Sequence, residues 1–421
     1  MTFEFEYLLH LLTCGAKGTT PKPPRQHVNY DCLIQLAQEQ AVLPIVGAAL
    51  GSARHTAFPI EKVQALAART RSLALTNYVK KELILKLLND FEEAGIQAVL
   101  LKGYTLADLY AEPNCRVSSD TDIYIDIKDE KRAYKLLREH GCKVNPRSSH
   151  NHHAVCEHPQ MGSIELHVLL YNDFFEFIWS GKIDERQFVA EKYETCKTAE
   201  HSYLALGKTD NLIYLALHMV KHFIFDRTNL RQMMDFALYL QYYQTQIDIN
   251  RFWETLESLK CRKLVNTILN VMVTYCDFCF DNLEGFMKAE ADETSVLIAD
   301  LEANGFIDRV DSKRRNDACK MYSRSIYLEK NSLFSYRCYM LKRRAISYMD
   351  ILFPPIKALT GQYPYIRKMK WLTPIAWIQH MLTLFQHLLR RIHGNNNAAH
   401  KNQAIHEKAD RYQLFRLMHM L

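Results

Sequence analysis

The 421-residue sequence lacks the long apolar run that a membrane-spanning helix requires. No stretch reaches the roughly 18 to 20 uninterrupted apolar residues that cross a bilayer, so we expect no transmembrane segment. An export signal is also missing, because the segment from Met1 to Glu6 is acidic and no cleavage site of small residues follows it. We therefore expect a cytoplasmic protein whose 11 cysteines are reduced thiols.

A strong charge of one sign is absent as well. The formal net charge is +6 over the whole chain, which suits phosphate-bearing partners. It is not gathered into the basic stripe with interleaved aromatic residues that is typical of nucleic-acid binding, so we do not expect a nucleic-acid partner. The apolar content of 48% and charged content of 24% are ordinary for a globular chain and exclude a mostly disordered one.

Both ends of the chain have the periodicity of helices, whereas one region between them does not. Residues 1–95 form an N-terminal helical region and residues 201–345 a helical domain, followed by a C-terminal helical segment with a mobile polar tail at 346–421. Between them, residues 96–200 alternate short strands with helices. The pattern predicts an α+β fold, in which a small mixed sheet is embedded between helical regions.

The strands are predicted from short apolar runs and from alternation of apolar and polar residues. Ile123, Ile125 and Ile127 fall on one face of a strand, whereas Asp120 and Asp122 fall on the other. The sequence predicts strands at 97–101, 120–127, 142–144, 153–157 and 163–169, with helices at 104–110 and 129–140.

Asp120 and Asp122 are the first candidates for chemistry. They lie two residues apart on a predicted strand, so both carboxylates point to the same face. Such a pair repels unless a cation lies between them, and Mg²⁺ or Mn²⁺ suits carboxylate oxygens. Glu165 lies on a separate predicted strand. If that strand pairs beside the first, Glu165 completes a two-metal site that activates an acceptor hydroxyl and holds a triphosphate.

Cations for the phosphates are also present. Lys102 and Gly103 stand at a strand-to-helix junction, where a glycine lets the backbone approach a phosphate. Arg116 is a second cation able to pair with phosphate oxygens. The alternative for Lys102 is an ion pair with Glu112, and for Arg116 an ion pair with Asp120.

These elements, in this order, resemble the uncharacterised nucleotidyltransferase family of the polymerase-β-like superfamily. That family has a Lys-Gly turn, an Arg shortly before an Asp-x-Asp strand, and an acidic residue two positions before a His on a later strand. The corresponding residues here are Lys102, Gly103, Arg116, Asp120, Asp122, Glu165 and His167, and the family's helical pattern matches His218, Arg231 and Asp235.

The resemblance implies a polymerase-β-like core and a Mg²⁺-dependent enzyme that moves a nucleoside monophosphate from an NTP to a hydroxyl-bearing acceptor, releasing pyrophosphate. Asp120, Asp122 and Glu165 would be the catalytic metal ligands, and Lys102, Gly103 and Arg116 would bind the triphosphate. The acceptor stays open among a small molecule, a protein side chain and an RNA end, of which the RNA end is least favoured.

Two other classes of function remain open. A catalytically inactive nucleotide-binding or scaffold relative is favoured by Glu165, because Asp is the usual residue at that position in the family. A helical interaction protein is the other class, in which the Asp-x-Asp pattern is incidental.

The remaining clusters have simpler interpretations. His150, His152, His153, Cys156 and His158 match no standard spacing of a structural zinc site, so we expect a polar edge or loop, although a histidine could approach the metal site. Cys276 and Cys279 are interpreted as buried thiols on a helix. His218 and His222 lack the Glu of a zincin motif, and Arg231 and Asp235 are spaced for a helical ion pair.

Overall fold

The structure is a computed structural model of the chain. It describes residues 1–53, 57–147, 152–170, 193–197, 201–225, 228–280, 282–303, 341, 349, 352–354, 359, 363–367, 369–394 and 417–418. The chain divides into two compact units, residues 1–322 with 414–421, and residues 323–413. The finer boundaries expected from the sequence stay a prediction.

The second unit contains a helix that the sequence predicted. α17 spans Thr373–Gly394 and follows two short 3₁₀ turns, η3 (Pro364–Arg367) and η4 (Lys370–Leu372). Leu359, Ile366 and Ala376 form a small buried cluster there. Of the predicted mobile tail, residues 395–416 lie outside the described residues.

Four helices open the first unit: α1 (Phe3–Lys17), α2 (Tyr30–Glu39), α3 (Leu43–Ser52) and α4 (Ile60–Glu93). α1 begins after Thr2, whose hydroxyl accepts a hydrogen bond from the Phe5 amide, and it ends at Gly18 with a φ of 72°. α4 runs for 34 residues without an internal glycine or proline.

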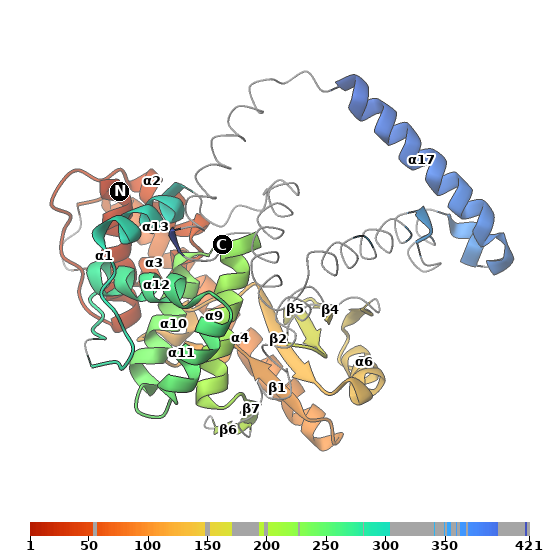
Figure 1. Cartoon of the computed structure of the whole chain (residues 1–421), viewed down its shortest axis with the longest axis horizontal. Coiled ribbons are helices and arrows are strands. Elements are labelled where there is room, and N and C mark those ends of the chain that lie inside the picture. The colour runs from red at the N-terminus through yellow and green to blue at the C-terminus, as the bar shows by residue number, and fades with distance from the viewer. Residues whose placement is uncertain are drawn as a thin grey trace. The chain divides into compact units, whose positions relative to one another are not determined.

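Five further helices follow the sheet: α9 (Lys208–Phe225), α10 (Leu230–Tyr243), α11 (Ile249–Ser258), α12 (Arg262–Tyr275) and α13 (Ala291–Ala303). They gather with α1, α2 and α3 at one end of this unit (Figure 1). The buried Gln40 links the two sets, because its amide donates to the Leu301 carbonyl at 2.7 Å and accepts from the Leu230 amide at 3.0 Å. The N-terminal helices and the later helices therefore share one compact unit.

The sheet has seven strands in the order β3-β4-β5-β2-β1-β7-β6. β1 pairs with β7 and β2 pairs with β5 in parallel, whereas the other pairs are antiparallel. The strands are β1 (Ala98–Leu101), β2 (Asp120–Ile125), β3 (Lys143–Asn145), β4 (His153–His158), β5 (Gly162–His167), β6 (Glu194–Lys197) and β7 (Ser202–Ala205). The predicted α+β fold with a mixed sheet is confirmed.

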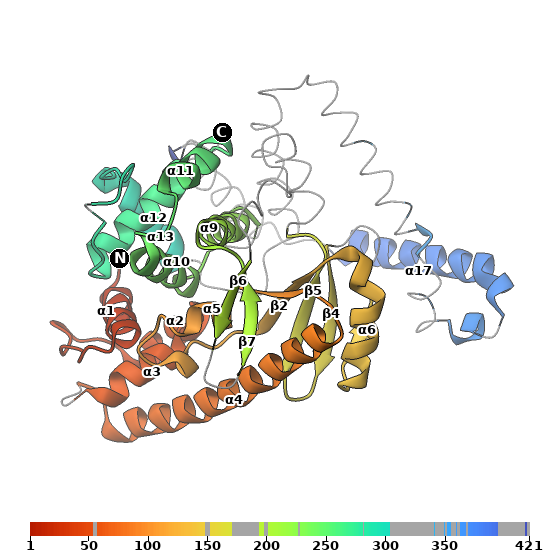
Figure 2. The same cartoon turned by 90° about the horizontal axis from the view of Figure 1, so that it is seen from below.

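Helices cover both faces of this sheet. α4 and α6 (Glu130–Glu139) lie against one face, and α9 lies on the other (Figure 2). Ile123 and Ile125 are fully buried in the core beneath α4, together with Ile84 and Phe91. Alternation along β2 therefore turns Asp120 and Asp122 toward the α9 side.

Some details differ from the sequence prediction. β6 and β7 were not predicted, and β7 carries the sheet past residue 200. The helix expected at 104–110 is a single turn, α5 (Tyr104–Ala107). β2 ends at Ile125, so Ile127 is exposed.

The cysteines and the helix lengths bear on two further expectations. All cysteines in the described part of the chain are free. Cys276 is buried as predicted, although α12 ends just before it, whereas Cys279 is exposed and lies on no helix. Within the described residues, no helix is both long enough and apolar enough to cross a membrane.

Candidate functional site

The carboxylates of Asp122 and Glu165 meet through the pairing of two parallel strands. Asp122 on β2 is directly opposite Glu165 on β5, and Tyr124 is opposite His167. One ligand atom each from Asp122, Glu165 and His167 lies within 4.8 Å of the others. Strand pairing therefore creates the acidic site that the sequence predicted only conditionally.

Asp120 lines the same cavity from the other end of this face. Its Oδ1 accepts hydrogen bonds from the Ser118 and Ser119 hydroxyls, both at 3.2 Å. Among the described residues, Asp120 lies outside the group formed by Asp122, Glu165 and His167. Two of the three predicted carboxylates thus converge closely, and the third lies beside them.

Asp122 is only 3% exposed and is neutralised from two sides. The Lys102 Nζ is 3.1 Å from its Oδ2, and the His167 Nε2 is 3.0 Å from its Oδ1. Burial alone would raise the pKa of Asp122, but Lys102 and His167 outweigh burial and hold that pKa well below its usual range. Asp122 is therefore an ionised carboxylate, paired on one oxygen with Lys102 and on the other with His167.

Lys102 connects the acidic site to helix α9. Its Nζ is also 2.9 Å from the Nε2 of His218, and the His222 Nε2 is 3.3 Å from that same atom. Burial and the nearby ammonium lower the pKa of His218 well below its usual range, so His218 is a neutral acceptor. Lys102 thereby bridges a carboxylate and an imidazole across the cavity.

The turn that presents Lys102 has an uncommon backbone. Lys102 has a φ of 38° and Gly103 a φ of 61°, both in the region that side chains other than glycine rarely adopt. Gly103 tolerates this conformation, but Lys102 is held in it by the structure around it. Gly103 itself does not line the cavity among the described residues, so its predicted contact with a triphosphate stays a prediction.

A single cavity of about 140 Å³ joins these groups. β-Strand residues form its floor, and one face of α9 forms its roof, because Tyr214, His218, Lys221 and His222 recur at helical spacing. The remaining lining residues are Lys102, Asp120, Asp122, His152, His153, Glu165, His167 and Leu170. The predicted site residues Lys102, Asp120, Asp122 and Glu165 are therefore brought together.

Arg116 is placed differently from Lys102. Its Nε and Nη2 donate to the two carboxylate oxygens of Asp235 on α10, at 3.1 and 2.5 Å, and it does not line the cavity among the described residues. Tyr110 donates to the same carboxylate at 2.7 Å. The ion pair is thus with Asp235 rather than Asp120, and the role of Arg116 at a triphosphate stays a prediction.

Asp235 was also expected to pair with Arg231, four residues before it on the helix. Instead its carboxylate binds Arg116 and Tyr110, while the Arg231 Nη1 donates to the Val117 carbonyl at 2.8 Å. Both arginines therefore attach the segment before β2 to helix α10. Local spacing could not indicate this, because the partners are more than 100 residues apart along the chain.

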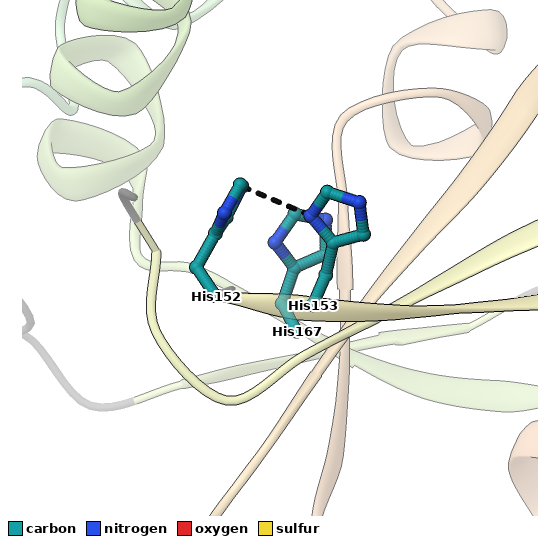
Figure 3. Close-up of side chains that lie close together, drawn as sticks. All are labelled: His152, His153 and His167. Atoms are coloured by element: carbon teal, nitrogen blue, oxygen red, sulfur yellow. Dashed lines mark hydrogen bonds between the residues drawn. The ribbon is translucent and has the colours of Figure 1, made fainter. Parts of the chain in front are cut away.

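His152, His153 and His167 also line the cavity, and their rings lie close together (Figure 3). His153 is the first residue of β4 and His152 precedes it, and His167, at the end of β5, is directly opposite His153. The polar edge expected from the sequence is therefore a compact histidine cluster. Spacing rules missed it because His167 joins from a separate strand, while Cys156 points into the core; His150 lies outside the described residues.

Sequence reasoning also missed the roof residues Tyr214 and Lys221. The available signal was the spacing of Tyr214, His218, Lys221 and His222, which places four polar side chains on one face of a helix. The sequence pattern singled out only His218 and His222, because two histidines four residues apart on a helix have the spacing of a metal-binding motif.

The donor set fits a hard divalent cation. Asp122 and Glu165 provide carboxylate oxygens on one wall, which Mg²⁺ and Mn²⁺ prefer, and Asp120 provides another on the same face. Lys102 and Lys221 line the same cavity and suit the phosphates of a bound nucleotide.

Comparison with known proteins gives one family. The model of the family described as uncharacterised nucleotidyltransferase matches residues 26–276, which is more than half of the chain and includes the whole sheet and helices α9 and α10. No curated protein gives a match.

Three solved structures are similar to the chain. An antigenic nucleotidyltransferase-like protein from Paracoccidioides brasiliensis is 14% identical, with 39% of this chain and 76% of that chain covered and a TM-score of 0.28. A tRNA nucleotidyltransferase complexed with a primer tRNA and an incoming ATP analog is 12% identical, with 73% and 99% covered and a TM-score of 0.22. A tRNA-processing enzyme is 11% identical, with 80% and 97% covered and a TM-score of 0.24. At these TM-scores the likeness carries no argument about the site.

Proposed function

The chain belongs to the uncharacterised nucleotidyltransferase family, and from that premise we propose that it is a Mg²⁺-dependent enzyme that transfers a nucleoside monophosphate from an NTP. The acceptor is a hydroxyl group of a small molecule or of a protein side chain, and pyrophosphate is released. The observation that supports this most is the alignment of Asp122 with Glu165 on parallel strands, with Asp120 on the same wall of the cavity.

Each residue of the cavity has a defined task in this proposal. Asp120, Asp122 and Glu165 hold the cation, which when bound neutralises phosphate charge and makes the acceptor hydroxyl more acidic. Lys102 pairs with a phosphate oxygen of the triphosphate, because its ammonium lies in the cavity beside the Asp122 carboxylate. Glu165, whose side chain is 27% exposed, is also placed to accept the acceptor's proton.

In this proposal Arg116 helps to position the carboxylates of the site. Its pair with Asp235 holds the segment before β2 against α10, so that Asp120 and Asp122 keep their orientation under α9. One buried nitrogen of Arg116, Nη1, has no hydrogen-bond partner in the described part of the chain, but a direct phosphate contact would require this nitrogen to be uncovered, because Arg116 does not line the cavity.

The test begins with nucleotide binding, because it requires no knowledge of the acceptor. We expect calorimetry to detect Mg²⁺-dependent binding of one or more of the four NTPs, and Asp122→Asn to abolish it. Asp126→Asn is the matched control, since Asp126 is an exposed acid just beyond β2 that pairs with Lys128. Binding that survives Asp122→Asn unchanged would sink the proposal.

Turnover is then measured with each labelled NTP and Mg²⁺, followed by pyrophosphate assay and mass analysis of whatever becomes labelled. We expect release of pyrophosphate together with a nucleotidylated product. Nucleotide binding without release, with small-molecule hydroxyls and protein acceptors both supplied, would support the non-catalytic relative instead.

A further inference from the structure

The backbone holds three imidazole rings together at one edge of the cavity. His153 and His167 are directly opposite each other on the antiparallel strands β4 and β5. The carbonyl of His152, just before β4, accepts a hydrogen bond from the Val168 amide at 2.9 Å, which extends the same ladder. Figure 3 shows the three rings standing side by side on the same side of the strands. Main-chain pairing thus sets His153 beside His167, and the bend at His152 brings its ring to the same side.

The distances between the rings are those of a nearly assembled metal site. The His152 Nε2 is 3.1 Å from the His153 Nδ1, and one ring nitrogen from each of the three residues lies within 4.8 Å of the others. Tetrahedral zinc with Zn–N bonds of about 2.0–2.1 Å separates its ligand nitrogens by roughly 3.3–3.4 Å. The first pair already has nearly this spacing, and the ring nitrogen of His167 lies within 4.8 Å of the other two.

His167 provides an independent observation. It is only 3% exposed, and its Nδ1 is buried without a hydrogen-bond partner among the described residues. An unpaired buried polar atom destabilises the fold, and a bound ligand removes that cost. Its Nε2 meanwhile lies 3.0 Å from the Asp122 carboxylate, the arrangement that orients metal-bound histidines from outside the metal's ligand set.

The chemistry of these donors differs from that of the carboxylate wall. Imidazole nitrogen favours zinc and other borderline transition-metal ions, whereas Mg²⁺ requires oxygen ligands. Glu165 lies at the boundary, with its Oε1 3.8 Å from the His153 Nε2. His153 is the most accessible of the three, with 23% of its side chain exposed, so a cation can enter at that side.

We propose that His152, His153 and His167 form a site for a divalent transition-metal ion, with Zn²⁺ as the best-suited ion and Glu165 beside it. This site goes beyond the nucleotidyltransferase proposal and does not depend on it. Because His167 contacts both Asp122 and Glu165, a cation on the histidines is coupled to the carboxylate wall. The cavity accordingly offers a nitrogen side and an oxygen side to two chemically different cations.

The experiment uses the full chain without a histidine tag, stripped of metal with a chelator. We expect one equivalent of Zn²⁺ to bind in competition with a chromophoric chelator. Co²⁺ should give the intense visible absorption of a four-coordinate site, and excess Mg²⁺ should not displace either ion. Absence of both stoichiometric Zn²⁺ binding and the Co²⁺ spectrum in the wild-type protein would overturn the proposal without any variant being made.

Two variants locate the site. His152→Ala and His153→Ala, each checked for folding by circular dichroism, should weaken Zn²⁺ binding at least about tenfold, because each removes a ligand. His27→Ala is the matched control, since His27 is exposed and lies outside the cavity. Equal affinity in the folded variants, or an equal loss in His27→Ala, would contradict the assignment. Zn²⁺ binding by a chain that neither binds nor turns over NTPs would support this site and count against the proposed function alone.

Discussion

Two buried carboxylates, Asp122 and Asp235, each have a cation beside them, but their surroundings differ. Asp235 accepts two hydrogen bonds from Arg116 and one from Tyr110, and its side chain is 5% exposed. Asp122 is buried as deeply, yet its partners Lys102 and His167 face a cavity and bind other groups as well. The first pair is closed around itself, whereas the second can exchange partners. Burial alone therefore does not distinguish a structural ion pair from a candidate site.

The same substitution at the two carboxylates gives the largest expected contrast. Removing one charge of a buried pair costs about 3–5 kcal/mol when the remaining charge cannot reach water. We expect Asp235→Asn to lower the free energy of unfolding by that amount. Asp122→Asn should lower the free energy of unfolding by less than half as much, because the Lys102 ammonium keeps its hydrogen bond to His218 and still faces the cavity. Urea denaturation of both variants measures the difference, and equal losses would remove the distinction between the pairs.

A double-mutant cycle sharpens this contrast. Arg116→Ala combined with Asp235→Ala should show a large coupling energy, because the two side chains are joined by two parallel hydrogen bonds and are both buried. The cycle between Lys102 and Asp122 should show a smaller one. A larger coupling in the cavity pair would reverse our assignment of which pair is structural.

The cavity pair should instead matter most for nucleotide binding. Lys102→Ala should weaken Mg²⁺-dependent NTP binding about 10- to 100-fold, since a charge-assisted hydrogen bond contributes about 1.5–3 kcal/mol. Lys128→Ala is the control, because Lys128 pairs with Asp126 and its side chain is 74% exposed. Calorimetry with the preferred NTP gives both affinities. Similar losses in the two variants would indicate a general effect of positive charge.

A smaller effect is expected at Tyr110, which also donates a hydrogen bond to Asp235 in its pair with Arg116. Tyr110→Phe removes the hydroxyl that donates to Asp235 at 2.7 Å and leaves both Arg116 bonds in place. The free energy of unfolding should fall by about 1–2 kcal/mol, with no change in Mg²⁺-dependent NTP affinity. Reduced affinity without reduced stability would connect Tyr110 to the cavity.

The smallest expected effect is at Ser119, whose exposed hydroxyl donates to Asp120. Ser119→Ala should change the free energy of unfolding by less than about 0.5 kcal/mol, as is usual for surface substitutions. Ser118→Ala, which removes the other donor to the same oxygen, is the natural comparison. A loss comparable to that of Tyr110→Phe would mean that Asp120 belongs to a closed network like that of Asp235.

Sequence reasoning predicted the parts of this comparison that follow from alternation within one element. The pattern of β2 placed Asp120 and Asp122 opposite Ile123 and Ile125, as the buried isoleucines confirm. The resemblance of the Lys102–Gly103, Arg116 and Asp-x-Asp elements indicated the family that the match over residues 26–276 establishes.

What could not be predicted depends on pairing between distant segments. The alignment of Asp122 with Glu165 requires β5 to lie parallel beside β2, and no local pattern specifies that neighbour. Arg116 was equally ambiguous, because its charge suits a phosphate as well as Asp235, which belongs to a helix that follows the sheet. His167 joined His152 and His153 for the same reason, across two strands.

The long sequence separation between the contacting residues also determines when the site is formed. Asp122 and His167 are 45 residues apart along the chain, Lys102 and His218 are 116 apart, and Arg116 and Asp235 are 119 apart. Contacts that close such long loops form late, because chain entropy opposes them until the surrounding elements are in place. A nascent chain therefore cannot form the Lys102–His218 and Arg116–Asp235 contacts until α9 and α10 have been synthesised. The cavity is complete only when the whole unit has folded. A partly folded intermediate should therefore lack the nucleotide-binding capacity proposed for the native protein.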